Sequence, residues 1–338
     1  MGFAFEQAYT KAVEFCELYA SMRPKAGFMK TILLRRIGSS VQAGLNTATA
    51  LLRSSEPSAV NTDEDGDDLF REDAAKIPLT SEERTLLLEV QTNLEAISQC
   101  TDADPKILVI LHYLRTMGWL ERHGSIIFSQ YFDTAEWVAT SLAAAFPTEP
   151  IGVYAGRGNS YLYRGNERVF AEREALKAKV KTDEIRILVA TDAACEGLNL
   201  QRLGSQINVD MPWNPARLEQ RKGRVQRIGQ LRDTIHVVNM RYAGTVEDDV
   251  YSALSARFSD IFAVLRELPD SFEDAWVDAV LKDREAVRYF PQRVDLISPP
   301  MVKRYWNDVA DDDDLDWEFT EKVLSSHDIE SHMRQGWR

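Results

Sequence analysis

The sequence predicts an α/β fold in which helices cover both faces of a parallel sheet, with helical extensions at both ends of the chain. Between residues 104 and 245, short apolar runs with strand character alternate with segments of helical periodicity. The strand-like runs occupy residues 125–129, 151–155, 185–190, 206–210 and 235–240. The helical segments between them occupy residues 133–146, 167–180 and 215–226. Short buried strands that alternate with helices are typical of a parallel sheet covered on both faces.

Both flanks of this region also have helical character. Apolar side chains recur at spacings of three and four in residues 8–22 and 81–97, and again in residues 251–265. The chain is therefore predicted to contain three regions, which are a helical region at 1–103, the α/β region at 104–245 and a helical extension at 246–338. Within the α/β region, Asp133 and Glu136 have the spacing of a capping box for the helix 133–146.

The charge is distributed unevenly along an acidic chain. The 338 residues carry a formal net charge of −13, with acidic residues concentrated at 56–104 and 311–316. Residues 18–55 contain six basic and no acidic side chains, and residues 217–232 contain six basic side chains and one Glu. Basic stripes on an acidic body suit a protein that contacts a phosphate backbone locally. Ordinary surface patterning is the alternative for the first stripe.

Several protein classes fit the sequence poorly. No apolar run approaches the roughly 20 residues of a membrane-spanning helix, and the amphipathic, acid-containing N-terminus does not resemble a signal peptide. The three cysteines and five histidines lack the spacing of metal ligands, and the cysteines form no plausible disulfide framework. We therefore expect a cytoplasmic protein that neither binds a metal through its own residues nor contacts a membrane.

The most informative segment is INVDMPWNPARLEQRKGRVQRIGQ, residues 207–230. An apolar strand ends in Asp210, a Pro-Trp-Asn-Pro turn follows, and a helix then carries Arg224 and Arg227 three positions apart, on one face. Two adjacent guanidinium groups suit a transferring phosphoryl group, whose charge is spread over several oxygens. An arginine pair on a helix is more often a solvated face, so the surrounding pattern matters. Upstream, ILVATDAACEGLNLQ at residues 187–201 is a second strand that ends in a polar turn.

Together these segments resemble motifs V and VI of superfamily 2 helicases. The Pro-Trp-Asn-Pro turn and the GRVQRIGQ ending resemble the SNF2-like ATP-driven DNA translocases, in particular the RapA-like branch of bacteria. The resemblance covers residues 104–254 and, more loosely, residues 30–52, where an Arg-x-x-Ser-Ser element occurs. It implies that the parallel sheet is RecA-like and is the second lobe of a two-lobed motor.

The resemblance also implies roles for individual residues. Arg227 matches the arginine finger that reaches the γ-phosphate held by the other lobe, and Arg224 would support it. The residues implied to lie near the nucleotide are Glu196, Gly197, Asn199 and Gln220. The residues implied to contact DNA are Ser129, Gln130, Tyr154, Gly156, Arg157 and Thr191.

The motifs of a first lobe are not found in this sequence. There is no GxxxxGK[ST] phosphate-binding loop, and GFMKT at residues 27–31 lacks the glycine immediately before Lys30. No DExD-like box ends an apolar strand. We therefore expect a second lobe that is inactive alone, with ATP and Mg²⁺ held mainly by a first lobe in the same protein or in a split partner.

The expected partners are double-stranded DNA, that first lobe, and further subunits of a defence or remodelling complex. RapA-like motors recycle RNA polymerase, remodel protein–DNA complexes or act in phage defence of the DISARM type. The helical flanks do not resemble polymerase-binding modules, which favours a defence role. Two other readings stay open: a non-catalytic DNA- or partner-binding module derived from a helicase lobe, and an RNA helicase lobe, which the Pro-Trp-Asn-Pro turn disfavours.

Overall fold

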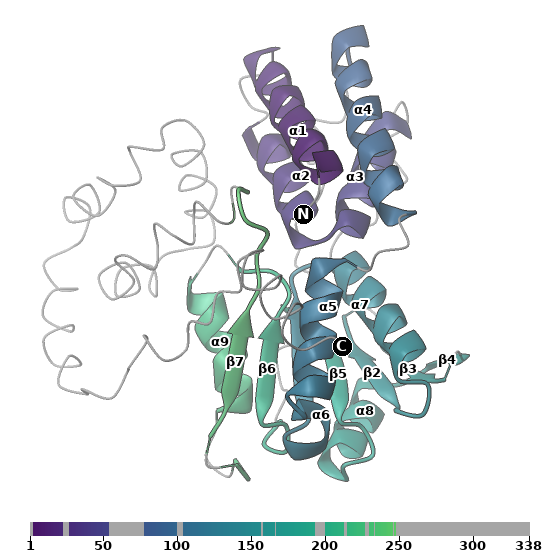
Figure 1. Cartoon of the computed structure of the whole chain (residues 1–338), viewed down its shortest axis with the longest axis vertical. Coiled ribbons are helices and arrows are strands. Elements are labelled where there is room, and N and C mark those ends of the chain that lie inside the picture. Colours follow the sequence, from purple (N-terminus) through teal and green to yellow (C-terminus); the bar gives the residue numbers. More distant parts are fainter. Residues whose placement is uncertain are drawn as a thin grey trace, which may run out of the picture.

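A computed structural model describes four stretches of the chain, and Figure 1 shows their arrangement. They are residues 3–22, 27–53, 78–99 and 104–245, with gaps at 157, 166, 193–199, 213–214, 227–229 and 233, followed by Glu247. Apart from Glu247, the predicted C-terminal extension lies outside the described residues. No helix among those described has both the length and the apolar character needed to cross a membrane.

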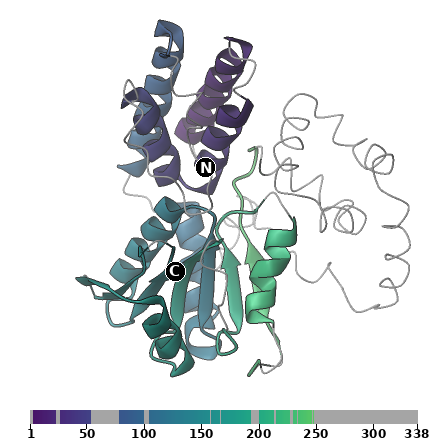
Figure 2. The same ribbon diagram turned by 180° about the vertical axis from the view of Figure 1, so that it is seen from behind.

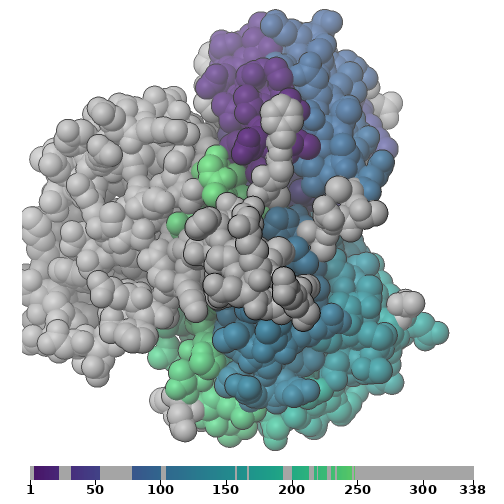
Figure 3. All heavy atoms as spheres, in the orientation of Figure 1, coloured from purple at the N-terminus to yellow at the C-terminus, as the bar shows by residue number. Residues whose placement is uncertain are grey.

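The N-terminal region is helical, as predicted. The helices α1 (Phe3–Met22), α2 (Gly27–Ser39), α3 (Val41–Arg53) and α4 (Ser81–Ser98) pack around a shared apolar core. Figure 3 shows α1 (purple) beside α4 (blue) on one side of this bundle. A capping box starts α4, because the Thr80 hydroxyl accepts from the Glu83 amide at 3.2 Å and the Glu83 carboxylate accepts from the Thr80 amide at 2.7 Å.

The second region is built on a seven-stranded mixed sheet. Its strands are β1 (Ser125–Ser129), β2 (Ile151–Tyr154), β3 (Tyr161–Arg164), β4 (Glu167–Phe170), β5 (Ile187–Thr191), β6 (Ser205–Asn208) and β7 (His236–Asn239). Their order is β4-β3-β2-β5-β1-β6-β7, and the neighbours from β2 to β7 are parallel. The predicted parallel sheet is therefore confirmed, with an antiparallel β3–β4 hairpin added at one edge.

Two local predictions are wrong. The helix predicted at 167–180 begins only with α8 (Arg173–Lys181), because the chain reverses at Gly165, whose φ is +58°, and residues 167–170 pair with β3 instead. Asp133 and Glu136 form no capping box: the N-cap of α7 (Phe132–Ala145) is Tyr131, without a side-chain cap. Arginines engage both carboxylates instead, because Arg36 pairs with Asp133 at 2.5 Å and Arg168 pairs with Glu136.

Helices cover both faces of the sheet. On one face, Ile127 of β1 packs in a core with α7, α5 (Pro105–Leu111), a π-helical turn η1 (His112–Thr116) and α6 (Trp119–Arg122). On the other face, Ile126 and Phe128 pack with α8 and with α9 (Pro215–Val225), which Figure 2 shows from behind. Alternate side chains of a strand point to opposite faces, so the apolar strand β1 is buried on both sides.

Lys106 joins the helical bundle to the α/β region. Its buried Nζ donates to the carbonyl oxygens of Gly38 at 2.8 Å and Ser39 at 2.9 Å, at the end of α2, and to that of Val209 at 2.6 Å. The last carbonyls of a helix lack partners within the helix, so a cation that binds them satisfies both the carbonyls and its own three donors. The Tyr242 ring lies 4.2 Å from the same Nζ and 4.9 Å from Phe5 of α1. These contacts hold α1 and α2 against the sheet.

Candidate functional site

The predicted motifs meet where β5, β1 and β6 end. These strands are adjacent, and Ser129 at the end of β1 is in register with Thr191 at the end of β5. Asp192 directly follows β5, and Asp210 lies two residues beyond β6. The carboxyl ends of parallel strands carry the functional loops in such sheets. The structure therefore brings polar residues from three separate segments to one edge.

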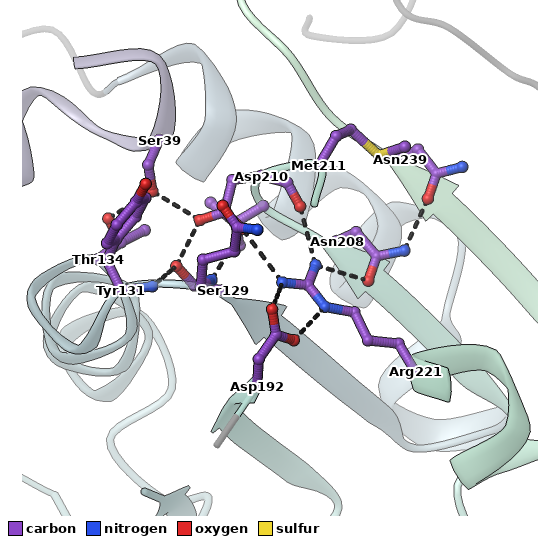
Figure 4. A network of polar contacts seen from close by, with 12 residues as sticks. Ser39, Ser129, Tyr131, Thr134, Asp192, Asn208, Asp210, Met211, Arg221 and Asn239 are labelled. Atoms are coloured by element: carbon purple, nitrogen blue, oxygen red, sulfur yellow. Dashed lines mark hydrogen bonds and ion pairs between the residues drawn. The ribbon is translucent and has the colours of Figure 1, made fainter. Parts of the chain in front are cut away.

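Arg221 of α9 fastens that helix to the edge. Its guanidinium is fully buried and binds Asp192 through two bonds, Nε to Oδ1 at 2.5 Å and Nη2 to Oδ2 at 2.8 Å. It also donates to the Asp210 carbonyl from Nη1 at 2.9 Å, and Nη2 lies 3.3 Å from Asp210 Oδ1 (Figure 4). A two-point guanidinium–carboxylate pair fixes orientation as well as distance. The helix α9 is thereby held to the ends of both β5 and β6.

Asp210 is the centre of the same network. Its Oδ2 accepts from the hydroxyls of Ser129 at 2.5 Å and Ser39 at 2.6 Å, and its Oδ1 accepts from the Gln130 amide at 2.9 Å. The side chain is almost fully buried, and these donors together with Arg221 compensate its charge. Sequence reasoning assigned no role to Asp210 or Arg221. The available signal was a carboxylate after each of two predicted strands and an arginine on the following helix.

Arg224 has a different environment from Arg221. It is half-buried on α9, and its guanidinium makes no ion pair or hydrogen bond within the described part of the chain. Its Nε is buried and lacks an acceptor among those residues, whereas its carbonyl accepts from the Leu200 amide at 3.4 Å. A cation on α9 that has no anion among the described residues fits an external anion such as a phosphate. Gln220, the residue predicted to open the motif, is exposed on the same helix.

The residues predicted to contact DNA are mostly buried. Ser129 and Thr191 have exposed fractions of 0% and 1%, and Gln130 accepts from Arg35 Nη2 through its Oε1 at 3.2 Å. Tyr154 ends β2, with its ring 5.5 Å from the Arg173 guanidinium, and Gly156 is buried shortly after it. Contact of these five positions with DNA stays a prediction. The other predicted site residues lie outside the described residues: Glu196, Gly197, Asn199, Arg157 and Arg227.

A buried carboxyl group lies near the network. Glu247 Oε1 accepts from the Met211 amide at 2.6 Å, whereas its Oε2 is buried without a partner among the described residues. The pKa of Glu247 is raised from 4.5 to about 7, mainly because the carboxyl group is buried; Lys106 lowers this pKa, and the Asp210 carboxylate raises it. A carboxyl group that keeps its proton avoids the cost of a buried negative charge.

This raised pKa predicts a pH-dependent stability. Between pH 4.5 and 7 the folded chain retains the Glu247 proton while the unfolded chain releases it. The stabilisation is therefore full below pH 4.5 and is lost as the pH rises through 7. For the Glu247→Gln variant we expect a smaller decrease in the free energy of unfolding between pH 5.5 and 8, by up to about 2 kcal/mol, when both proteins are unfolded in urea. Parallel pH profiles for the two proteins would contradict this assignment.

Metal binding finds no support among the described side chains. Within residues 3–245, apart from the gaps given above, no three His, Cys, Asp or Glu side chains are grouped to hold an ion. The described cysteine, Cys16, is buried in the bundle core.

The comparisons with known proteins agree with this geometry. Residues 105–229 match the family model described as "Helicase conserved C-terminal domain". This part of the chain is therefore a helicase C-terminal domain, and its similarities are consistent with the C-terminal lobe of an SNF2-family protein.

Three relatives illustrate the similarity. The chain is 46% identical over 87 residues to the "Uncharacterized ATP-dependent helicase YqhH" of Bacillus subtilis. This match covers 26% of this chain and 15% of that protein. It is 27% identical over 168 residues to the "SNF2 domain-containing protein CLASSY 3" of Arabidopsis thaliana, covering 47% and 11% of the two chains. It is 34% identical over 110 residues to the "RNA polymerase-associated protein RapA" of Vibrio atlanticus, covering 27% and 11%. The matched regions thus span 11% to 15% of these relatives.

Proposed function

We propose that the chain is the second motor lobe of an SNF2-like translocase that uses ATP to move along double-stranded DNA. One observation carries the proposal: α9, which Arg221 fastens to the carboxyl edge of the sheet, carries one arginine that is paired internally and one that has no partner among the described residues. Arg221 is neutralised by two buried aspartates, whereas Arg224 lacks an internal partner among the described residues. A fixed helix that presents an uncompensated guanidinium suits phosphoryl transfer, where preorganised positive charge stabilises the transition state.

The nucleotide and its Mg²⁺ would supply the transferable phosphoryl group, and a first lobe would hold most of both. Within this chain, Arg224 and Arg227 would contact the charge that develops on the phosphoryl oxygens. Arg221, through Asp192 and Asp210, would keep α9 from moving as that charge develops. Electrostatic stabilisation is strongest when the donors need no rearrangement during the reaction. The similarity to proteins named as ATP-dependent helicase and as SNF2 domain-containing protein supports this division of roles.

The DNA would be bound through its phosphates and without sequence preference. Predicted contacts at Ser129, Gln130, Tyr154, Gly156, Arg157 and Thr191 would follow the tracked strand. Backbone contacts position a protein on DNA but carry no base information. The same proposal includes a role in phage defence or a role on RNA polymerase. The helical flanks favour the defence role, and the similarity to a protein named RNA polymerase-associated favours the polymerase role equally.

ATP turnover tests the proposal directly. We expect the purified chain alone to hydrolyse no ATP, with or without DNA, because its sequence contains no phosphate-binding loop or acidic box. Addition of a matching first lobe, in trans or by fusion, should produce turnover that duplex DNA stimulates more than RNA does. The same mixture with Arg224→Ala is the control. Turnover by the chain alone would refute the single-lobe proposal, stronger stimulation by RNA would favour an RNA helicase, and DNA binding without turnover in the mixture would favour a binding module.

A further inference from the structure

Two consecutive serines at the end of the bundle make different contacts with the α/β region. Ser39, the last residue of α2, donates to Asp210 Oδ2 at 2.6 Å and lies 2.7 Å from the Thr134 hydroxyl. Ser40 lies 2.7 Å from the same Thr134 hydroxyl and accepts from the Ala43 amide at 3.0 Å. Both side chains are fully buried. Among the described contacts, Ser39 binds Asp210 and Ser40 does not.

Asp210 connects Ser39 to the arginine-bearing helix. One carboxylate oxygen accepts from Ser39, and the other lies 3.3 Å from Arg221 Nη2, which also binds Asp192. A short series of side chains therefore runs from the bundle to α9, as Figure 4 shows. Its bundle end is rigid, because Lys106 binds the Ser39 carbonyl at 2.9 Å and Arg36 pairs with Asp133 at 2.5 Å.

We propose that Ser39 is a positioning residue for the arginines of α9. By donating to Oδ2, Ser39 holds the Asp210 carboxylate with Oδ1 toward Arg221, and Arg221 in turn orients the helix that carries Arg224. Loss of this donor leaves a buried carboxylate oxygen with the Ser129 hydroxyl as its remaining described donor, which favours other orientations of the side chain. The helical bundle is thus part of the apparatus that places Arg224. The consequence for catalysis rests on the proposed function, whereas the positioning does not.

Hydrogen exchange in this chain tests the positioning without any ATPase assay. We expect Ser39→Ala to speed amide exchange in the peptide that covers Pro215–Val225 by about tenfold, because a hydrogen bond to a buried charged group is lost. Ser40→Ala is the matched control, since it removes an equally buried hydroxyl that also contacts Thr134. Ser40→Ala should leave exchange in α9 within twofold of the parent. Exchange in α4 reports global opening, so any acceleration there measures the general loss of stability in each variant, and the acceleration expected for α9 is counted beyond it.

The outcomes separate positioning from general stability. Equal acceleration of α9 by the two variants, or acceleration by neither, would overturn the role of Ser39. In the two-lobed motor, Ser39→Ala should lower kcat for ATP by about tenfold with KM within twofold, whereas Ser40→Ala should change neither. A selective effect on α9 exchange without any effect on kcat would retain the positioning and refute the proposed role of Arg224 in phosphoryl transfer.

Discussion

Replacement of Arg227 by Ala in the complete two-lobed motor is expected to lower ATP turnover by about 10³–10⁵, the range that arginine fingers contribute. The guanidinium would meet negative charge that grows on the γ-phosphate during transfer, so its loss acts mainly on the transition state. We therefore expect kcat to collapse while DNA binding and thermal unfolding remain close to those of the parent. Lys at this position should not restore turnover, because an ammonium lacks the planar fork of donors.

Arg224→Ala should also be severe and should in addition weaken nucleotide binding, since Arg224 would support the finger. The Arg224 guanidinium makes no ion pair within the described residues. The substitution therefore breaks no described ion pair, and a loss of turnover can be attributed to the missing charge. Gln226→Ala, at the exposed position that directly follows α9, is the control for a nearby substitution that removes no arginine. If Arg227→Ala kept turnover within about threefold of the parent, Arg227 would be a surface residue and the motif assignment would be wrong.

The central sheet could be predicted because its strands are short, apolar and separated by helices. Strands such as β1 and β5 are buried on both faces, so burial itself determines their sequence. The edge hairpin could not be predicted in the same way. All four residues of β4 are exposed, so no apolar alternation marks Glu167–Phe170 as a strand, and the turn at Gly165 depends on a backbone conformation.

The candidate site, like the fold, could be predicted from the sequence only in part. Its location was predictable, since Ser129, Thr191 and Arg224 belong to segments that end strands or follow them. Which arginine is neutralised was not predictable, because Arg221 and Arg224 lie on one helix and differ only in what the fold brings to them. Asp192 is 29 positions before Arg221 and Asp210 is 11 positions before it. Ser39 reaches Asp210 across 171 positions, a pairing that no local pattern encodes.

Arg221→Ala is expected to destabilise the chain by about 3–5 kcal/mol, the cost of breaking a buried ion pair from one side. The variant leaves the Asp192 and Asp210 carboxylates near each other without the cation that bridges them. It also leaves a cavity where the largest fully buried side chain among the described residues had been. Urea unfolding of the isolated chain measures this loss, and Gln226→Ala at the exposed position directly after α9 should change the midpoint little.

A further pair of variants distinguishes the lost charge from the lost volume. Arg221→Met fills much of the cavity but still leaves the carboxylates unpaired, so it should remain strongly destabilised. Adding Asp192→Asn to Arg221→Met removes one of the two unpaired charges and should recover part of the stability, because the two residues are in direct contact and their effects are not additive. Additive effects of the two substitutions, or an Arg221→Ala variant within about 1 kcal/mol of the parent, would mean that the Arg221 network does not hold α9. In that case the fixed helix on which the placement of Arg224 depends would need another anchor.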